Sequence, residues 1–187
     1  MPGNRSDDER RQTAMKRLTV LLVIALTAAA CGASDSGGPD DSPEVLAAAI
    51  LELITEDHTF GDGPPPFTDY LIQSSLDPFA GDPTASGSDE LRDLTSGEQA
   101  AILAAVAPYG PVTWIEDPGD FITEDLVPTV EGAAIIGVGE PAFDGDEALV
   151  PVSLWCGGSC GTWLTYKLQL TDTGWVVTGI EGPIAVS

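Results

Sequence analysis

Basic residues are scarce in this chain, and they are unevenly distributed. The sequence contains 7 lysine and arginine residues against 30 aspartate and glutamate residues. Five of the basic residues lie in the first 30 positions, so the remainder carries only Arg92 and Lys167 against 27 acidic residues, a net charge of −25. Such a surface repels nucleic acids and anionic headgroups, which excludes nucleic-acid binding. We interpret the acidic surface as a solvated one, with cation binding as the alternative.

Residue types that support catalysis or metal binding are also few. His58 is the only histidine, so a Ser-His-Asp hydrolase would have to use it, and no G-x-S-x-G motif accompanies it. A structural zinc site needs four Cys or His ligands, which the chain does not offer in one place. We therefore expect His58 to be a surface residue just past a helix end. The sequence predicts no catalytic residue, no metal and no cofactor.

Acidic side chains occur in clusters, and each cluster has a structural and a chemical interpretation. Glu116-Asp117 and Glu124-Asp125 could supply the two carboxylates of a glycosidase, but such pairs arise by chance in an acidic chain. Residues 143–147 contain calcium-type oxygen ligands without the twelve-residue EF-hand pattern, which favours a tight acidic hairpin turn. Core or sheet packing is favoured over a sugar-binding face for the four tryptophans, Trp114, Trp155, Trp163 and Trp175.

The sequence has no apolar run of the roughly 20 residues that a membrane-spanning helix needs. Its main apolar run, residues 18–30, follows Lys16 and Arg17 and ends in small residues. This order is typical of a secretory signal peptide, which we predict over residues 1–30. Met15 is an alternative start, because the segment from Met15 onward is a complete signal without residues 1–14.

Each of the three cysteines has a predicted use. Cys31 follows three alanines in a pattern that resembles a lipobox, in which the cysteine becomes the acylated first residue. We predict a lipid anchor on Cys31 that holds the domain on the extracytoplasmic face of the membrane; a secreted chain with a free thiol is the alternative. Cys156 and Cys160 are then predicted to form a disulfide in this oxidising compartment, with zinc and redox chemistry as weaker alternatives.

The rest of the chain divides into a short tether and one domain. Residues 31–42 predict a flexible acidic tether, and residues 43–187 predict a single domain. Ser42 is expected to cap a helix that ends near Glu56. Thr95 or Ser96 is expected to cap a second helix, with Leu103 on its buried side. The intervening residues 57–93 predict irregular loops around a short apolar stretch at residues 70–72.

The C-terminal half changes to strand periodicity. Strands are predicted over residues 112–115, 133–138, 147–155, 162–171 and 175–180. Pro151 favours a sheet edge or a bulge, and residues 172–174 favour a three-residue hairpin loop. The predicted fold class is α+β: two N-terminal helices followed by a curved antiparallel sheet, a layout that resembles NTF2-like and cystatin-like proteins.

The last 35 or so residues carry a more specific resemblance. They contain C-G-G-S-C-G at residues 156–161, T-Y-x-L at 165–168 and G-W-V-V-x-G at 174–179. This segment resembles the tail of uncharacterised exported proteins and lipoproteins that are frequent in actinobacteria. The resemblance implies a hairpin pinned by Cys156 and Cys160, and it brings no known activity. We therefore expect a non-catalytic domain that binds a protein partner or a small ligand; an extracytoplasmic hydrolase of unrecognised type is the alternative.

Overall fold

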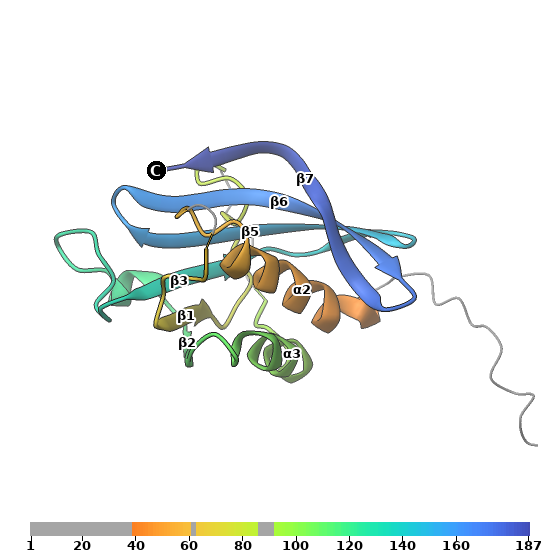
Figure 1. The fold of residues 1–187 in the computed structure, drawn as a ribbon, viewed down its shortest axis with the longest axis horizontal. Helices are drawn as coiled ribbons and strands as arrows, with labels where there is room; N and C mark the ends of the chain where they lie inside the picture. Colours follow the sequence, from red (N-terminus) through yellow and green to blue (C-terminus); the bar gives the residue numbers. More distant parts are fainter. Residues whose placement is uncertain (1–38, 61–62, 86–91) are drawn as a thin grey trace, which may run out of the picture. The chain divides into compact units, whose positions relative to one another are not determined.

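A mixed sheet of seven strands, with helices against one of its faces, forms the core of the computed structural model, which describes residues 39–60, 63–85 and 92–187 (Figure 1). Along the chain the elements are η2 (Pro39–Asp41), α2 (Ser42–Thr55), β1 (Asp69–Gln73), α3 (Ser96–Val106), β2 (Val112–Ile115), η3 (Pro118–Phe121), β3 (Ala133–Val138), β4 (Ala142–Asp144), β5 (Glu147–Gly157), β6 (Cys160–Thr171) and β7 (Gly174–Val186). The α+β class is confirmed. The predicted order is wrong, because strand β1 lies between the two helices.

The strands are not all antiparallel, which corrects a second part of the prediction. Their order is β2-β1-β3-β5-β6-β7, with β4 beside β5. Strand β1 runs parallel to both β2 and β3, and the remaining pairs are antiparallel. Helix α3 explains why β1 and β2 are parallel. It returns the chain to the end of the sheet at which β1 begins, so β2 runs in the same direction.

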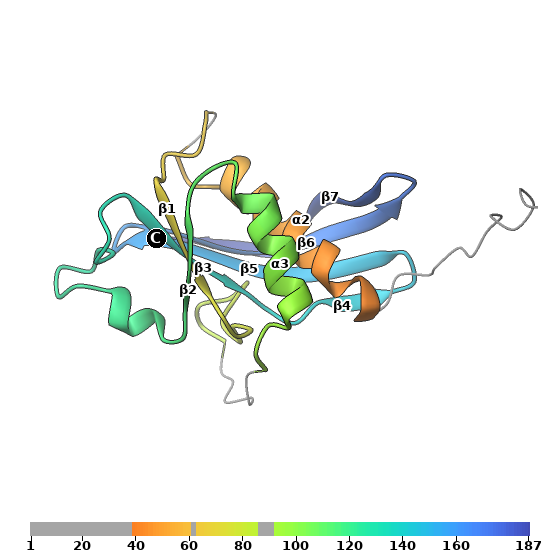
Figure 2. The same cartoon turned by 90° about the horizontal axis from the view of Figure 1, so that it is seen from below.

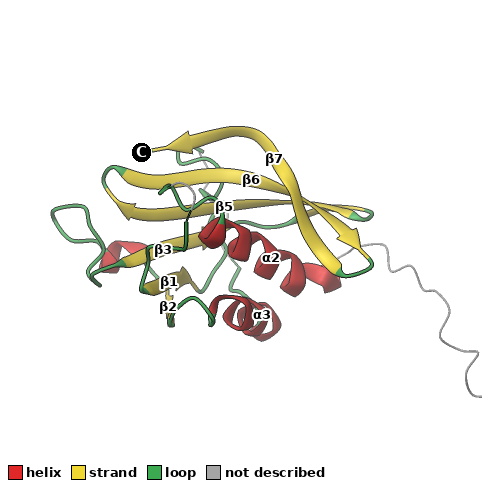
Figure 3. Cartoon of the chain, in the orientation of Figure 1, coloured by secondary structure: helices red, strands yellow, loops and turns green. Residues whose placement is uncertain are grey.

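Helix α2 supplies the helical half of the main core. It forms where predicted, and its apolar stripe is fully buried at Val45, Leu46, Ala49, Ile50, Leu53 and Ile54. The helix packs on α3 and on strands β5 to β7, and both helices lie on the same side of the sheet (Figures 2 and 3). Its N-cap is Asp41 rather than the predicted Ser42, because the Ser42 hydroxyl donates to Glu98 instead.

Helix α3 begins with the predicted capping box. The Thr95 hydroxyl accepts from the Glu98 backbone N–H at 3.2 Å, and the Glu98 carboxylate accepts from the Thr95 N–H at 2.7 Å. Ile102 and Val106 are buried as expected, but Leu103 is 44% exposed, which contradicts its predicted place on the buried side. Since the helix packs mainly on α2, its apolar stripe is narrow.

Strand β1 was not predicted from the sequence. Residues 57–93 were expected to be irregular, yet β1 lies between β2 and β3 inside the sheet. Tyr70 and Ile72 face the main core, while Leu71 joins a second apolar cluster on the opposite face, with Ile115, Ala133 and Ile135. A five-residue strand that is buried on both faces has no alternation to reveal it.

The C-terminal strands form as predicted but are longer, and two details differ. β5 is an interior strand, and Pro151 lies where its neighbour changes from β4 to β3, with its carbonyl accepting from the Gly139 N–H at 2.8 Å. The loop between β6 and β7 has two residues, because Thr171 pairs with Gly174. This register places Trp175 opposite Leu170, where its side chain is only 8% exposed. Burial of the largest side chain thus outweighs the three-residue turn preference.

The predictions for the N-terminal region fall mostly outside the described residues. The signal peptide, Cys31 and residues 32–38 of the tether all lie there. The last residues of the predicted tether are helical instead: Pro39–Asp41 form the short helix η2, and Ser42 begins α2. Within the described ranges, no helix is long and apolar enough to cross a membrane.

Candidate functional site

A disulfide between Cys156 and Cys160 closes the turn that joins β5 to β6, as the sequence predicted. The two Cα atoms are 5.1 Å apart. Strands β5 and β6 continue to Gly157 and Cys160, so the turn itself contains only Gly158 and Ser159. The bridge therefore fixes the tip of a hairpin whose strands lie in the middle of the sheet.

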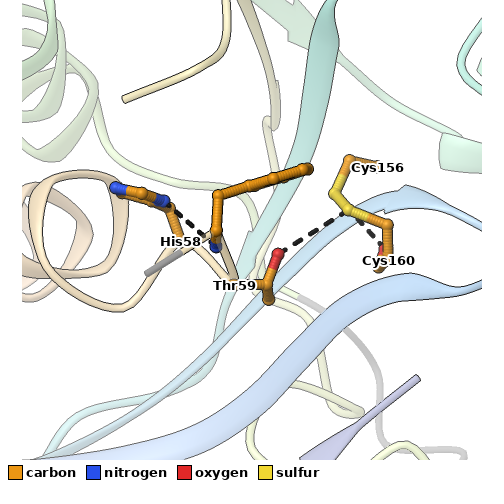
Figure 4. The surroundings of a disulfide bond; sticks show 5 residues. His58, Thr59, Cys156 and Cys160 are labelled. Atoms are coloured by element: carbon orange, nitrogen blue, oxygen red, sulfur yellow. Dashed lines mark hydrogen bonds between the residues drawn. A yellow bond between two sulfur atoms is a disulfide. The ribbon is translucent and has the colours of Figure 1, made fainter. Parts of the chain in front are cut away.

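The loop after α2 reaches this disulfide. The Thr59 side chain points toward the bridge, with its hydroxyl 3.7 Å from Cys160 Sγ, whereas His58 points away from it (Figure 4). The hydroxyl is the donor, since a disulfide sulfur carries no proton. Thr59 has a φ of 71°, which is unusual for a β-branched residue. The loop is thereby held against the β5–β6 hairpin.

Between these segments lies a groove of about 730 Å³. Its lining comes from three parts of the chain that are distant in sequence: the loop after α2, the start of β6 and the end of β7. The following residues line it: Glu56, Asp57, Thr59, Phe60, Ser159, Cys160, Gly161, Thr162, Leu164, Ile184, Val186 and Ser187. Pockets of this size accommodate small molecules.

One wall of the groove is apolar and exposed. Phe60 is 59% exposed, Ile184 is 52% exposed and Val186 is 73% exposed. The Phe60 ring makes an edge contact with Phe67, with ring centres 5.8 Å apart, which restricts its orientation. Exposed apolar side chains that share a concave surface are a common feature of binding sites.

Another part of the lining is acidic. Glu56 and Asp57 follow the last turn of α2 and line the groove, and Glu52 lies one turn earlier. Burial raises the pKa of Glu52, and the Glu56 and Asp57 carboxylates raise it further. The backbone carbonyls at a helix C-terminus add partial negative charge. The end of α2 is therefore a site of concentrated negative potential.

Tyr166 anchors this acidic wall to the sheet. Its hydroxyl donates to Asp57 Oδ2 at 2.6 Å from β6, and its side chain is 1% exposed. Burial, together with the Asp57 hydrogen bond, raises the pKa of Tyr166 far above its ordinary value. Asp57 is held in a fixed orientation as a result, with its second oxygen left for other partners.

Both basic residues of the described chain are engaged elsewhere. Lys167 pairs with Glu147 at 2.8 Å, and Arg92 pairs with Glu98 at 2.9 Å and with Glu140 at 3.0 Å. None of the residues that line the groove is basic. The carboxylates at the end of α2 are therefore not neutralised by lysine or arginine within the described residues.

His58 is buried, which corrects its predicted surface position. It is 1% exposed; its Nδ1 accepts from the Phe60 N–H at 3.4 Å, and its Nε2 lies 3.3 Å from the Gly63 carbonyl oxygen. Both contacts are with backbone groups of its own loop. Among the described hydrogen bonds, none joins His58 to a carboxylate or to a serine. Its structural role is to shape the loop that carries Thr59 and Phe60.

A second polar cluster joins the starts of the two helices. Glu98 is 2% exposed and accepts from the Ser42 hydroxyl at 2.6 Å and from both Arg92 Nη atoms at 2.9 Å. Burial opposes ionisation of Glu98, but the hydrogen bonds from Arg92, Ser42 and the Thr95 backbone outweigh it and lower the pKa to about 2. A depression lined in part by Arg92 and Phe143 adjoins the cluster. Each charged group has a partner here, which is typical of a structural ion pair.

The other acidic candidates are separate from the groove. Residues Gly145–Asp146 form the two-residue turn between β4 and β5, which confirms the hairpin interpretation. Asp117 caps η3 by accepting from the Gly119 N–H at 2.8 Å. Glu124 and Asp125 are exposed in the loop before β3. In the described part of the chain, no group of three His, Cys, Asp or Glu side chains is arranged to hold a metal ion.

The four tryptophans take packing positions on both faces of the sheet. Trp175 is buried in the main core against Phe143, and Trp114 packs against the same core. Trp155 packs on the second apolar cluster, and the Trp163 ring lies over Gly161. Because they are divided between faces, they do not form one aromatic binding surface.

Comparisons with known proteins found no match to this chain. No family model matches it, no curated protein is similar to it, and no solved structure matches its fold. The function has to be inferred from the groove and its chemistry.

Sequence reasoning found one component of this site, the disulfide, and missed the rest. Thr59, Phe60, Ile184 and Val186 belong to no motif, and only the folded chain brings them together. The acidic triplet Glu52, Glu56 and Asp57 was visible in the sequence as acids at the end of an amphipathic helix. That position is a weak signal in a chain with this much negative charge.

Proposed function

We propose that this chain is a non-catalytic binding domain, displayed outside the cell membrane by a lipid on Cys31, and that the groove is its ligand site. The signal-like leader, the cysteine at its end and the C-terminal resemblance to exported lipoproteins support the location. The likeness to NTF2-like and cystatin-like proteins stays an architectural proposal, supported by a sheet that packs against one central helix.

One observation carries the binding role: an open groove whose lining combines exposed apolar side chains with carboxylates. Phe60, Ile184 and Val186 are exposed there, and Glu56 and Asp57 line the same groove. Ligand sites combine apolar surface with a few polar groups that fix orientation. This combination gives both affinity and selectivity without any chemical step.

The reactive side chains are arranged for binding rather than for hydrolysis. A nucleophile needs a base within hydrogen-bond reach. His58 is occupied by backbone groups, and the Cys160 sulfur is held in the disulfide. These arrangements favour the binding proposal over the hydrolase alternative.

A groove-filling variant tests the proposal. Ser159 lies exposed in the β5–β6 turn and lines the groove, so Ser159→Trp should fill it. Asp172→Trp, in the exposed turn at the other end of β6, is the matched control. Small ligands are screened by thermal shift with the full exported chain. Compounds that raise the Tm of the wild type and of Asp172→Trp should leave the Tm of Ser159→Trp unchanged. Ligands that stabilise all three proteins equally would contradict the groove as the binding site.

A further inference from the structure

We infer that the groove binds an organic cation: an ammonium group attached to a small apolar body. This inference rests on the proposed binding function and specifies its ligand class. The ammonium group would lie against the carboxylates at the end of α2, and the apolar body against Phe60, Ile184 and Val186.

Charge complementarity gives the first reason. Glu56 and Asp57 line the groove, Glu52 lies one turn away, and α2 directs its negative end to the same place. Arg92 and Lys167, the two basic residues of the described chain, are both paired at other sites. An incoming cation would therefore gain attraction without displacing an existing ion pair.

Phe60 gives the second reason. Its ring is 59% exposed at the groove and is restrained by the contact with Phe67. The face of an aromatic ring attracts ammonium groups, and this attraction acts in addition to apolar contact. A carboxylate pair beside a restrained, exposed ring suits an organic cation better than a neutral molecule.

A bare metal ion fits this groove less well. Metal ions such as calcium require six to eight oxygen ligands. Asp57 Oδ2 already accepts from Tyr166, and the described residues offer no converging group of three ligand side chains. The apolar wall would also contribute nothing to the binding of a bare ion, whereas it would contact the body of an organic cation.

Three hexyl compounds that differ only in their head group test the inference. Hexyltrimethylammonium, hexanesulfonate and hexyl glucoside are titrated into the full exported chain by calorimetry. The cation should bind about tenfold more tightly than the other two, as expected for two or three partly exposed charge contacts. Glu56→Gln with Asp57→Asn should remove about tenfold of this affinity, since both replacements keep shape and remove charge. Asp144→Asn with Asp146→Asn, at the far end of β5, removes equal charge and should change the Kd by less than about twofold.

The outcomes separate this inference from the proposed function. Equal binding of all three compounds, abolished by Ser159→Trp, would overturn the cation inference and leave the groove as a binding site. If none of the three compounds binds, both the cation inference and the proposal that the groove binds small ligands are overturned. A lysine-containing peptide that binds where hexyltrimethylammonium does not would assign the groove to a protein partner and would also overturn the inference.

Discussion

At the scale of single residues, Glu98 links three segments of the chain through one carboxylate. It accepts hydrogen bonds from Ser42 at the start of α2, from Arg92 in the preceding loop and from Thr95 at its own cap. A buried charge is stable only when it is paired and hydrogen-bonded, and these contacts meet that condition. The relative position of the two helix starts depends on this residue.

Replacing Glu98 should destabilise the domain. We expect Glu98→Gln to lower the free energy of unfolding by about 2 kcal/mol at pH 7, because Arg92 and Ser42 lose a charged acceptor. Glu140 is the other carboxylate partner of Arg92, and its side chain is 63% exposed. Glu140→Gln should therefore cost less than about 1 kcal/mol. Urea unfolding of both variants measures the difference. Equal losses would contradict the importance of the buried partner.

The same residue predicts a pH dependence. The pKa of Glu98 is lowered from 4.5 to about 2 in the folded protein. Its contribution to stability is therefore fully present above pH 4.5, and it is lost as the pH falls toward 2. The difference in unfolding free energy between wild type and Glu98→Gln should shrink across this interval. A difference that stays constant from pH 7 to pH 3 would show that these contacts do not lower the pKa of Glu98.

The sequence revealed residues whose role is local. The capping box of Thr95 and Glu98 was predicted because its two members are three residues apart. The contacts of Glu98 with Ser42 and of Asp57 with Tyr166 span 56 and 109 positions, and no local pattern indicates them. The burial of His58 was also missed: its hydrogen-bond contacts with Phe60 and Gly63 are local, and no sequence pattern indicates that this loop buries the ring.

At the scale of elements, the β5–β6 hairpin connects stability to the groove. Its disulfide fixes the turn, and Cys160 and Ser159 form part of the groove wall. Thr59 reaches the same sulfur from the loop after α2. Loss of the bridge should therefore affect ligand affinity as well as folding.

We expect Cys156→Ser with Cys160→Ser to reduce the free energy of unfolding by about 2 kcal/mol, because a five-residue loop gives only a small entropic constraint. The domain should stay folded, since β5 and β6 pair along most of their length. Mass mapping of the unreduced protein should join Cys156 to Cys160, and chemical denaturation gives the loss. Complete unfolding of the double variant would contradict this account.

The elements that the sequence predicted well are those with clear periodicity. Helix α2 and strand β6 show one apolar stripe or one clean alternation, and both were placed within two residues. Strand β1 was missed because it is short and buried on both faces. The β6–β7 register was missed because it depends on the burial of Trp175, a tertiary effect that competes with local turn preference.

At the scale of the whole molecule, negative charge should govern stability. The residues after position 30 carry a net charge of −25, and three ion pairs are present among the described residues. Sodium chloride screens the repulsion, so the Tm should rise with salt, by roughly 2–4 °C for each kcal/mol of repulsion removed. Calcium at matched ionic strength should give no additional rise. A much larger rise with calcium would indicate a specific inorganic cation site.

Membrane anchoring is a second prediction at this scale. Cys31→Ser should abolish incorporation of a palmitate analogue during metabolic labelling, because the predicted lipid attaches to that thiol. Cys156→Ser with Cys160→Ser is the matched control, and it should still be labelled. Equal labelling of wild type and Cys31→Ser would contradict the lipoprotein assignment.

Both proposals place the ligand in the groove between the end of α2, the start of β6 and the end of β7. Backbone amide chemical shifts measured during a titration with hexyltrimethylammonium locate the bound cation. We expect shifts concentrated at residues 56–60, 159–164 and 184–187, with little change at the β4–β5 turn, residues 144–147. Shifts spread evenly over the acidic surface, or centred on the opposite face near Trp155, would contradict this placement of the ligand.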